Sequence, residues 1–237
     1  PCYNEYENLF ILIKQIKKIF KNYLIVVIDD SSSDIIKDKI KISKKIKYFQ
    51  RKKKSGRGSA VLFGMNKILK EKKVSLIIEM DTDLSSHPKE LPQNIKLFLK
   101  RKLDLLVMSR YKKKSKIINW PLRRRVFSFL SNKLARFLLQ VNISDYTMGY
   151  RIYSKQAVKH VVKNCGKIGT GFIVLSEILA ELNSNNYKIE DVDTVFINRE
   201  KGESSVNIKL ILESLIGVFK IYFLQKKRKN INSNHAN

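Results

Sequence analysis

Short apolar runs rich in Ile, Val and Leu alternate along this chain with longer segments in which apolar residues recur at helical spacing. The runs predict strands at 24–28, 47–50, 74–78, 103–109 and 187–198. The helical spacing predicts helices at 6–20, 34–42, 59–69, 89–99, 121–139 and 206–224, and another that begins near Phe172. This alternation is typical of an α/β fold with a mostly parallel, doubly wound sheet.

Acidic residues follow two of the predicted strands. The run at 74–78 stops before Asp81 and Asp83, and the run at 24–28 ends in Asp29 and Asp30. A lone Asp-x-Asp is more often two surface acids than a site, but a second acid-ended strand favours a site, because α/β folds bind ligands at the carboxyl edge of the sheet. Carboxylates without soft ligands suit Mg²⁺ or Mn²⁺.

Composition places the chain among globular proteins, with 237 residues, 43% of them hydrophobic and 29% charged. The formal net charge of +27 suggests nucleic acid, an anionic membrane or a phosphate-rich substrate as partner. A coding bias towards Lys, Ile and Asn explains the excess of positive charge equally well, since the lysines are scattered along the chain. Cys2 and Cys165 build no disulfide framework, so a reducing, cytoplasmic compartment is the default. No signal peptide is visible, and no apolar run reaches bilayer length.

Two further features leave alternatives open. The loop Ser55-Gly56-Arg57-Gly58 opens a predicted helix and either presents backbone N–H groups to phosphate or is only a turn; it lacks the ending of a P-loop. The segment 121–139 carries an apolar stripe beside cations, which indicates either a core-facing helix or one in a membrane interface. The apolar segment 206–224 carries three charges and should lie on a bilayer or against the protein.

The chain resembles the family-2 GT-A glycosyltransferases in six collinear segments: PCYNE at 1–5, VVIDDSSSD at 26–34, GRGSA at 56–60, MDTDLSSHPKELP at 80–92, SRY at 109–111 and NWPLRRRVFS at 119–128. Three later segments resemble the dolichyl- or polyprenyl-phosphate mannosyltransferase branch: SDYTMGYRIY at 144–153, GFIVLSEIL at 171–179 and FINREKGESS at 196–205. The resemblance implies a GT-A (Rossmann-like) fold, with a mostly parallel sheet flanked by helices and with amphipathic helices at the membrane surface.

The resemblance also implies the site residues. The nucleotide-sugar would be bound by Pro1, Tyr3, Glu5, Ile28, Asp30, Asp81, Thr82, Asp83 and Arg199, and Asp81, Asp83 and Ser85 would be the metal ligands. Arg110, Arg124 and Arg199 would grip the donor diphosphate and the acceptor phosphate, and Glu177 would line the acceptor side unless it is only a helix-surface acid.

Several positions depart from the family pattern. Cys2, Met148, Asp193 and Ser205 replace a Thr, a small polar residue, a Pro and a Lys. The family begins with a central strand that leads into the P-x-Y-N-E loop, and this sequence lacks it, so we expect a fragment with an open core. We expect a catalytic domain at 1–205, an amphipathic and basic helix at 206–229 and a disordered tail at 230–237.

The resemblance predicts an inverting, metal-dependent transfer of mannose from GDP-mannose to a polyprenyl or dolichyl phosphate. The cofactor would be Mg²⁺ or Mn²⁺, and the enzyme would be peripheral at the cytoplasmic face of a membrane, possibly with a small membrane-anchoring subunit. Within the enzyme class, the alternative is a UDP-sugar donor with undecaprenyl phosphate or a polysaccharide as acceptor. From another class, a basic nucleic-acid-binding protein is favoured only by charge and lacks a reading motif, so we expect no nucleic-acid partner.

Overall fold

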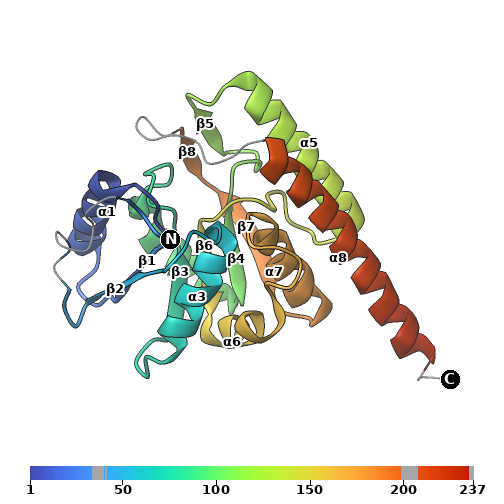
Figure 1. Ribbon diagram of the computed structural model, residues 1–237, viewed down its shortest axis with the longest axis horizontal. Coiled ribbons are helices and arrows are strands. Elements are labelled where there is room, and N and C mark those ends of the chain that lie inside the picture. Colours follow the sequence, from blue (N-terminus) through green and yellow to red (C-terminus); the bar gives the residue numbers. More distant parts are fainter. Residues whose placement is uncertain (34–39, 41, 199–207, 235–237) are drawn as a thin grey trace.

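A four-stranded sheet forms the centre of the computed structural model, which describes residues 1–33, 40, 42–198 and 208–234 (Figure 1). Its strand order is β3-β6-β4-β7. The strands are β3 (Leu76–Glu79), β4 (Leu105–Ser109), β6 (Arg151–Ser154) and β7 (Ile189–Asp193). Strand β4 pairs in parallel with β7, and β6 runs antiparallel between β3 and β4. All five residues of β4 are buried, so this strand is the middle of the core.

Two smaller parallel pairs flank the central sheet. They are β1 (Ile25–Asp29) with β2 (Ile46–Gln50) and β5 (Lys116–Ile118) with β8 (Val195–Ile197). The single predicted strand at 187–198 is therefore divided between β7 and β8, and the predicted helix at 34–42 lies largely outside the described residues. The α/β fold with parallel strands flanked by helices is confirmed.

Helices cover both the sheet and its edges. They are α1 (Tyr6–Ile19), α3 (Arg57–Leu69), η1 (Pro88–Glu90), α4 (Leu91–Arg101), α5 (Leu122–Leu139), α6 (Lys155–Asn164), α7 (Ile173–Ser184) and α8 (Ile208–Asn234). Local chemistry sets several boundaries: the Ser154 hydroxyl caps α6 by accepting from Ala157 N, and Lys102 ends α4 in the left-handed region at φ 51°. Helix α8 continues to Asn234, into the segment for which the sequence predicted a disordered tail.

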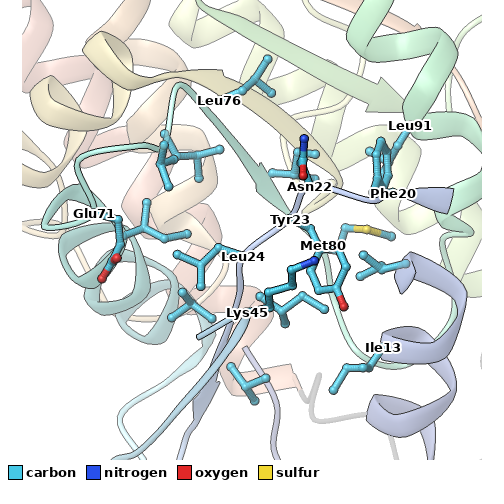
Figure 2. Close-up of a pocket in the computed structure, with 18 of the residues that line it drawn as sticks. Ile13, Phe20, Asn22, Tyr23, Leu24, Lys45, Glu71, Leu76, Met80 and Leu91 are labelled. Carbon is cyan, nitrogen blue, oxygen red and sulfur yellow. The ribbon is translucent and has the colours of Figure 1, made fainter. Parts of the chain in front are cut away.

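A largely apolar cavity of about 1060 Å³ lies between β1 and β3. Figure 2 shows side chains from several elements, among them Ile13, Leu24, Leu76 and Leu91, directed into it. Both strands run the same way, because Cys2 pairs with Asp29 at the end of β1 and the chain just after β3 also meets Pro1. The cavity therefore lies between the facing edges of these two strands.

Helices α5 and α8 pack along one another (Figure 1). Both helices carry exposed apolar side chains. Much of the predicted stripe of α5 faces away from the core: Phe137 is 78% and Leu130 57% exposed, whereas Leu138 packs against the core. The residues that α5 buries are Asn132, Ala135 and Leu139. Among the described residues, no helix combines the length and apolarity that crossing a bilayer requires.

Helix α8 lies close to the core through a glycine. A Cβ at Gly217 would lie 2.4 Å from Cγ1 of Ile173, at the start of α7. Val218 and Ile221 are buried nearby, whereas Phe223 is 63% exposed. One face of α8 therefore packs on the protein, while its other face continues the exposed apolar surface of α5.

Candidate active site

Asp81 and Asp83 lie directly after β3, at the carboxyl end of a strand in the central sheet. Thr82 between them is buried, and its hydroxyl donates to the carbonyl oxygen of Pro1 at 3.4 Å. Asp83 accepts a hydrogen bond from the backbone N of Ser85 at 3.1 Å. The predicted acids thus stand at a strand end beside the first residues of the chain, where the sequence placed the donor.

The guanidinium of Arg57 pairs with Asp81. Arg57 Nε donates to Asp81 Oδ1 at 2.8 Å, and Nη2 lies 2.8 Å from Glu79 Oε1 at the end of β3. Burial acts to lower the pKa of Arg57, but the two carboxylates outweigh it and raise the pKa, so the guanidinium stays charged. Sequence reasoning missed this partner of Asp81, although Arg57 stood inside the glycine loop that it singled out.

Asp30 binds the glycine loop. Its carboxylate accepts from Gly56 N at 2.8 Å and from Ser55 N at 3.0 Å, and it forms an ion pair with Arg51 at 2.9 Å. The N–H groups of Ser55 and Gly56, which could have cradled a phosphate, are therefore occupied by a carboxylate of the same chain. Of the two interpretations of this loop, the turn is the one that these contacts favour.

The other residues predicted to bind nucleotide surround the start of the chain. Tyr3 is 37% exposed and its ring lies 3.5 Å from Lys54 Nζ, and Glu5 accepts from the side chain of Asn8. Ile28 is buried and lies against α3, where a Cβ at Gly64 would be 2.9 Å from its Cγ1. Tyr3 and Glu5 line an accessible face, whereas Ile28 contributes through packing.

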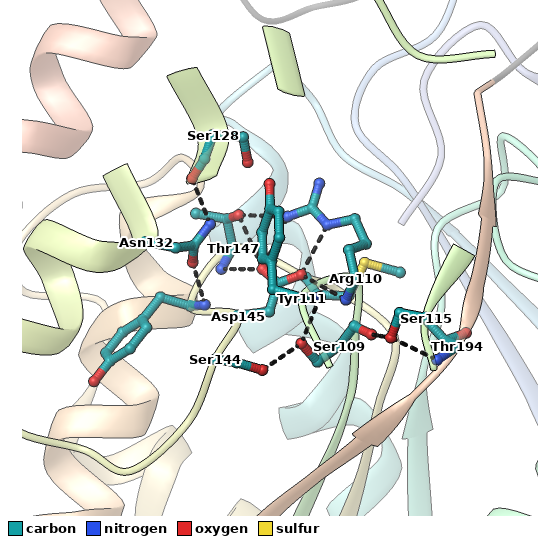
Figure 3. A network of polar contacts seen from close by, with 12 residues as sticks. Ser109, Arg110, Tyr111, Ser115, Ser128, Asn132, Ser144, Asp145, Thr147 and Thr194 are labelled. Atoms are coloured by element: carbon teal, nitrogen blue, oxygen red, sulfur yellow. Dashed lines mark hydrogen bonds and ion pairs between the residues drawn. The ribbon is translucent and has the colours of Figure 1, made fainter. Parts of the chain in front are cut away.

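Arg110 is held by a buried two-pronged ion pair with Asp145 (Figure 3). Arg110 Nε lies 2.8 Å from Asp145 Oδ2, and Nη2 lies 2.9 Å from Oδ1 and 2.7 Å from the hydroxyl of Thr147. Burial works against ionisation of both groups, but the pairing outweighs it, which raises the pKa of Arg110 and lowers that of Asp145. Asp81 also contributes to raising the pKa of Arg110, so Asp81 and Arg110 are within electrostatic range.

A polar network connects this pair to α5. Asn132 of α5 accepts from Tyr146 N and donates to the carbonyl oxygen of Ser128, and Asp145 stands next to Tyr146 (Figure 3). On the other side, the hydroxyls of Ser109 and Ser144 lie 2.7 Å apart. The loop that carries Asp145 is therefore attached to both α5 and the end of β4.

Arg110 and Arg124 share the ring of Trp120. Their guanidinium carbons lie 5.0 Å and 5.8 Å from its centroid, and Phe196 of β8 is a further ring neighbour of Arg110. The structure therefore brings two of the three predicted phosphate-binding arginines together. Arg199 and Ser205 lie outside the described residues.

Glu177 of α7 turns towards the end of α6. Its carboxylate accepts from Gly166 N at 2.8 Å and from Lys167 N at 3.1 Å. Burial raises its pKa in spite of these hydrogen bonds. Glu177 is buried, so it is not the solvated helix-surface acid of the alternative reading, and the contacts described for it go to this turn and not to Asp81 or Arg110.

The acids after β3 fit a divalent cation of the Mg²⁺ type. No group of three His, Cys, Asp or Glu that could hold a metal occurs within the described ranges. Mg²⁺ is commonly bound by one or two carboxylates together with substrate phosphates, and Asp81 and Asp83 supply such a pair. Ser85 is buried, and its carbonyl oxygen accepts from Ile197 N at 3.0 Å. The donor set is therefore suited to an ion that shares its shell with a diphosphate.

Comparison with known protein families identifies the family of this chain. The model of "Glycosyl transferase family 2" matches residues 1–162. The chain belongs to glycosyltransferase family 2. This family 2 glycosyltransferase is an enzyme similar to the dolichyl-phosphate mannosyltransferases, as the collinear segments predicted.

Curated relatives match over most of the chain. A polyprenol monophosphomannose synthase of Mycolicibacterium smegmatis is 30% identical over 92% of this chain and 83% of its own length. A dolichol-phosphate mannosyltransferase of Pyrococcus furiosus is 33% identical over 93% of this chain, which spans 62% of that protein. An undecaprenyl-phosphate mannosyltransferase of Micrococcus luteus is 29% identical over 92% of this chain and 90% of its own length.

Solved structures share the fold at low identity. Glucosyl-3-phosphoglycerate synthase of Mycobacterium tuberculosis, in complex with phosphoglyceric acid, superposes with a TM-score of 0.67 at 14% identity, over 93% of this chain and 77% of that one. Another structure of the same enzyme gives a TM-score of 0.66 at 16% identity, over 94% and 78%. These likenesses show the GT-A-like fold.

Proposed function

We propose that this family 2 glycosyltransferase transfers mannose from GDP-mannose to a polyprenyl phosphate, with inversion and with Mg²⁺ or Mn²⁺. The observation that carries the proposal is the placement of Asp81 and Asp83 at the end of β3, within electrostatic range of Arg110, in a chain whose curated relatives are mannosyltransferases named for polyprenol, dolichol and undecaprenyl phosphates. The segment around Pro1 supports a nucleotide site next to these acids.

The proposed reaction depends on the alignment of the acceptor with the donor more than on proton transfer. A phosphate acceptor is already an anion, so the side chains need only hold it in line with the sugar carbon while the nucleoside diphosphate departs. A divalent cation, when bound at Asp81 and Asp83, would supply Lewis-acid stabilisation of the departing diphosphate. Arg110 and Arg124 bring fixed positive charge to the same region around Trp120, which favours two phosphorylated substrates.

The exposed apolar surface of α5 and α8 supports a lipid-linked acceptor. Its large apolar side chains stand beside cations of the same helices, among them Arg125 and Lys133 of α5 and Lys220 of α8. Such a surface suits binding to anionic lipid, with apolar side chains in the acyl region and cations at the headgroups. In this proposal the enzyme acts at a membrane surface, on the cytoplasmic side, by itself or with a small anchoring subunit.

A transfer assay tests the donor, the acceptor and the site together. GDP-mannose and UDP-glucose are each offered with a short polyprenyl phosphate, with metal and after EDTA treatment. We expect transfer from GDP-mannose that requires metal and that falls roughly a hundredfold or more in Asp83→Asn. Asp193→Asn, which changes an exposed acid of β7, is the matched control and should stay active. Transfer from UDP-glucose alone would support the alternative donor, and full activity of Asp83→Asn would overturn the site.

A further inference from the structure

Two glycines at the start of α3 fix the position of one side chain. Gly56 has φ +96°, and a Cβ on it would lie 2.7 Å from the carbonyl oxygen of Thr170. A Cβ at Gly58 would lie 2.3 Å from the carbonyl oxygen of Gly171. Only glycine allows the backbone to lie this close, so the pair sets Arg57, which stands between them, against the segment that opens α7.

A third glycine makes room for the guanidinium. A Cβ at Gly149 would lie 1.8 Å from Nη2 of Arg57 and 2.9 Å from Oδ2 of Asp81. Any larger residue at position 149 would thus displace the guanidinium, the carboxylate or both. Two glycines that flank Arg57 and a third from the segment before β6 therefore fix the position of its contact with Asp81.

The contact has an electrostatic consequence. The side chain of Arg57 is only 12% exposed, and Asp30 accepts a hydrogen bond from the neighbouring Gly56 N, so the guanidinium has little freedom to move away from Asp81. It already neutralises part of the negative charge of Asp81 and Glu79. A divalent cation that approaches Asp81 must therefore come close to a fixed positive charge, and the repulsion is strong in a partly buried site. A diphosphate that arrives with the cation supplies the missing negative charge.

We propose that Arg57 is a positioning residue that fixes the carboxylate of Asp81 and makes metal binding there depend on the donor's diphosphate. This rests on the proposed function for the presence of a metal, but not for the base, sugar or acceptor. Arg57 keeps Asp81 oriented through Oδ1, and it keeps the site weak for a free cation until a diphosphate is present. Metal and donor then bind as one unit.

Manganese binding tests the proposal without any transfer reaction. Free Mn²⁺ is followed by electron paramagnetic resonance, with inorganic pyrophosphate, GDP or UDP as the diphosphate and with none. For the unmodified protein we expect weak Mn²⁺ binding alone and at least tenfold tighter binding with pyrophosphate. Arg57→Gln should bind Mn²⁺ alone roughly tenfold more tightly, and its gain from pyrophosphate should shrink. Arg57→Lys retains the charge and should bind Mn²⁺ alone as weakly as the unmodified protein.

Matched variants separate this role from a general effect of charge or folding. Arg101→Gln removes one positive charge from an exposed ion pair with Glu190 and should leave Mn²⁺ binding unchanged. If Arg57→Gln does not fold, the unmodified protein still tests the proposal, because its binding of Mn²⁺ must be at least tenfold tighter with pyrophosphate than without it. In transfer assays Arg57→Lys should lower kcat more than it raises KM, because Nε and Nη2 both contact Oδ1 of Asp81 and a lysine cannot reproduce the two contacts.

The outcomes are distinct. Equal Mn²⁺ binding with and without pyrophosphate in the unmodified protein, or no change in Arg57→Gln, would overturn the role of Arg57. A normal response to pyrophosphate with no preference for GDP over UDP would leave the role of Arg57 intact and count against the proposed donor. If Mn²⁺ does not bind under any condition, both the metal site and the role of Arg57 fail.

Discussion

Arg110 and Asp145 face one another as a buried two-pronged ion pair, with Arg110 Nε 2.8 Å from Asp145 Oδ2 and Nη2 2.9 Å from Oδ1. Asp145 is wholly enclosed, and it also accepts from the backbone N of Thr147. One residue of the pair comes from the end of β4 and the other from the loop before β6. The pair therefore connects the core of the sheet to the wall of the site, and breaking it should affect both stability and activity.

The first prediction concerns the loss of that pair. Asp145→Asn keeps the shape of the side chain but leaves the charge of Arg110 buried without its counter-ion. We expect the free energy of unfolding to fall by about 3–5 kcal/mol, measured by urea denaturation. Glu190→Gln, which breaks the exposed pair with Arg101, should cost less than about 1 kcal/mol. Similar losses in the two variants would show that burial of the pair is unimportant.

The second prediction follows from the lowered pKa of Asp145. A carboxylate whose folded pKa lies below its ordinary value of 3.8 stabilises the fold above that value and loses this contribution as the pH falls towards the folded pKa. The stability advantage of the unmodified protein over Asp145→Asn should therefore be constant near neutrality and shrink below pH 3.8. Urea denaturation of the two proteins across this range measures it, and an advantage that grows on acidification would contradict it.

Glu177 should show the opposite dependence on pH. Burial raises its pKa above the ordinary value of 4.5, so the folded state binds the proton more tightly than the unfolded chain does. Its contribution is fully present below pH 4.5 and is lost as the pH rises through the folded pKa. The stability of Glu177→Gln relative to the unmodified protein should therefore improve as the pH rises through this window. Paired thermal melts test this, and an unchanged difference across the window would refute it.

Because of the cavity between β1 and β3, the same Val→Ala truncation should reduce stability by different amounts at different positions. Val27 lines the cavity, whereas Val107 of β4 is fully enclosed by the core. Val107→Ala should destabilise by about 2 kcal/mol, because it removes two methyl groups and leaves a void. Val27→Ala should cost roughly half as much, since its side chain already borders empty space. Chemical denaturation compares them, and a larger loss for Val27→Ala would mean that the region is well packed in solution.

Membrane attachment through α5 and α8 is the last prediction. Replacing Phe137 and Phe223 by Ser should weaken binding to vesicles of phosphatidylcholine and phosphatidylglycerol at least tenfold, because each exposed ring loses about 1.5–3 kcal/mol of burial. Ile42→Ser changes an apolar residue elsewhere that is 61% exposed and is the control. Flotation at low and high salt measures binding, which should weaken with salt. Equal flotation of the two variants would place the membrane contact elsewhere.

Much of the site was predictable, because its acids follow apolar runs directly. The run before Asp81 has the β-branched composition of a buried strand, and parallel strands bring their carboxyl ends to one edge. The collinear segments of the family indicated Arg110 and Arg124 as well, and the structure places both around Trp120. Their roles in transfer remain predictions. The boundaries within 187–198 were not predictable, since one apolar run holds both β7 and β8.

Exposure of α5 could not be read from its pattern. An apolar stripe beside cations suits burial against a core as well as contact with lipid, and only the position of the helix distinguishes the two. In the structure α5 uses Ala135 and Leu139 for packing and leaves Phe137 to solvent. The lateral contact with α8 then extends the exposed surface over two helices.

The amino-acid sequence by itself determined the α/β alternation, the acids at the ends of β1 and β3 and the glycines around Arg57, because these depend on local pattern and spacing. Only the tertiary structure decided which charged side chains form ion pairs. Arg57 and Asp81 are 24 positions apart, and Arg110 and Asp145 are 35 apart. Such pairs form when packing brings two loops together, and no local preference of either residue encodes the partner. Local sequence patterns therefore identified the acids and glycines of the site, whereas the pairing of its charges was decided by the tertiary fold.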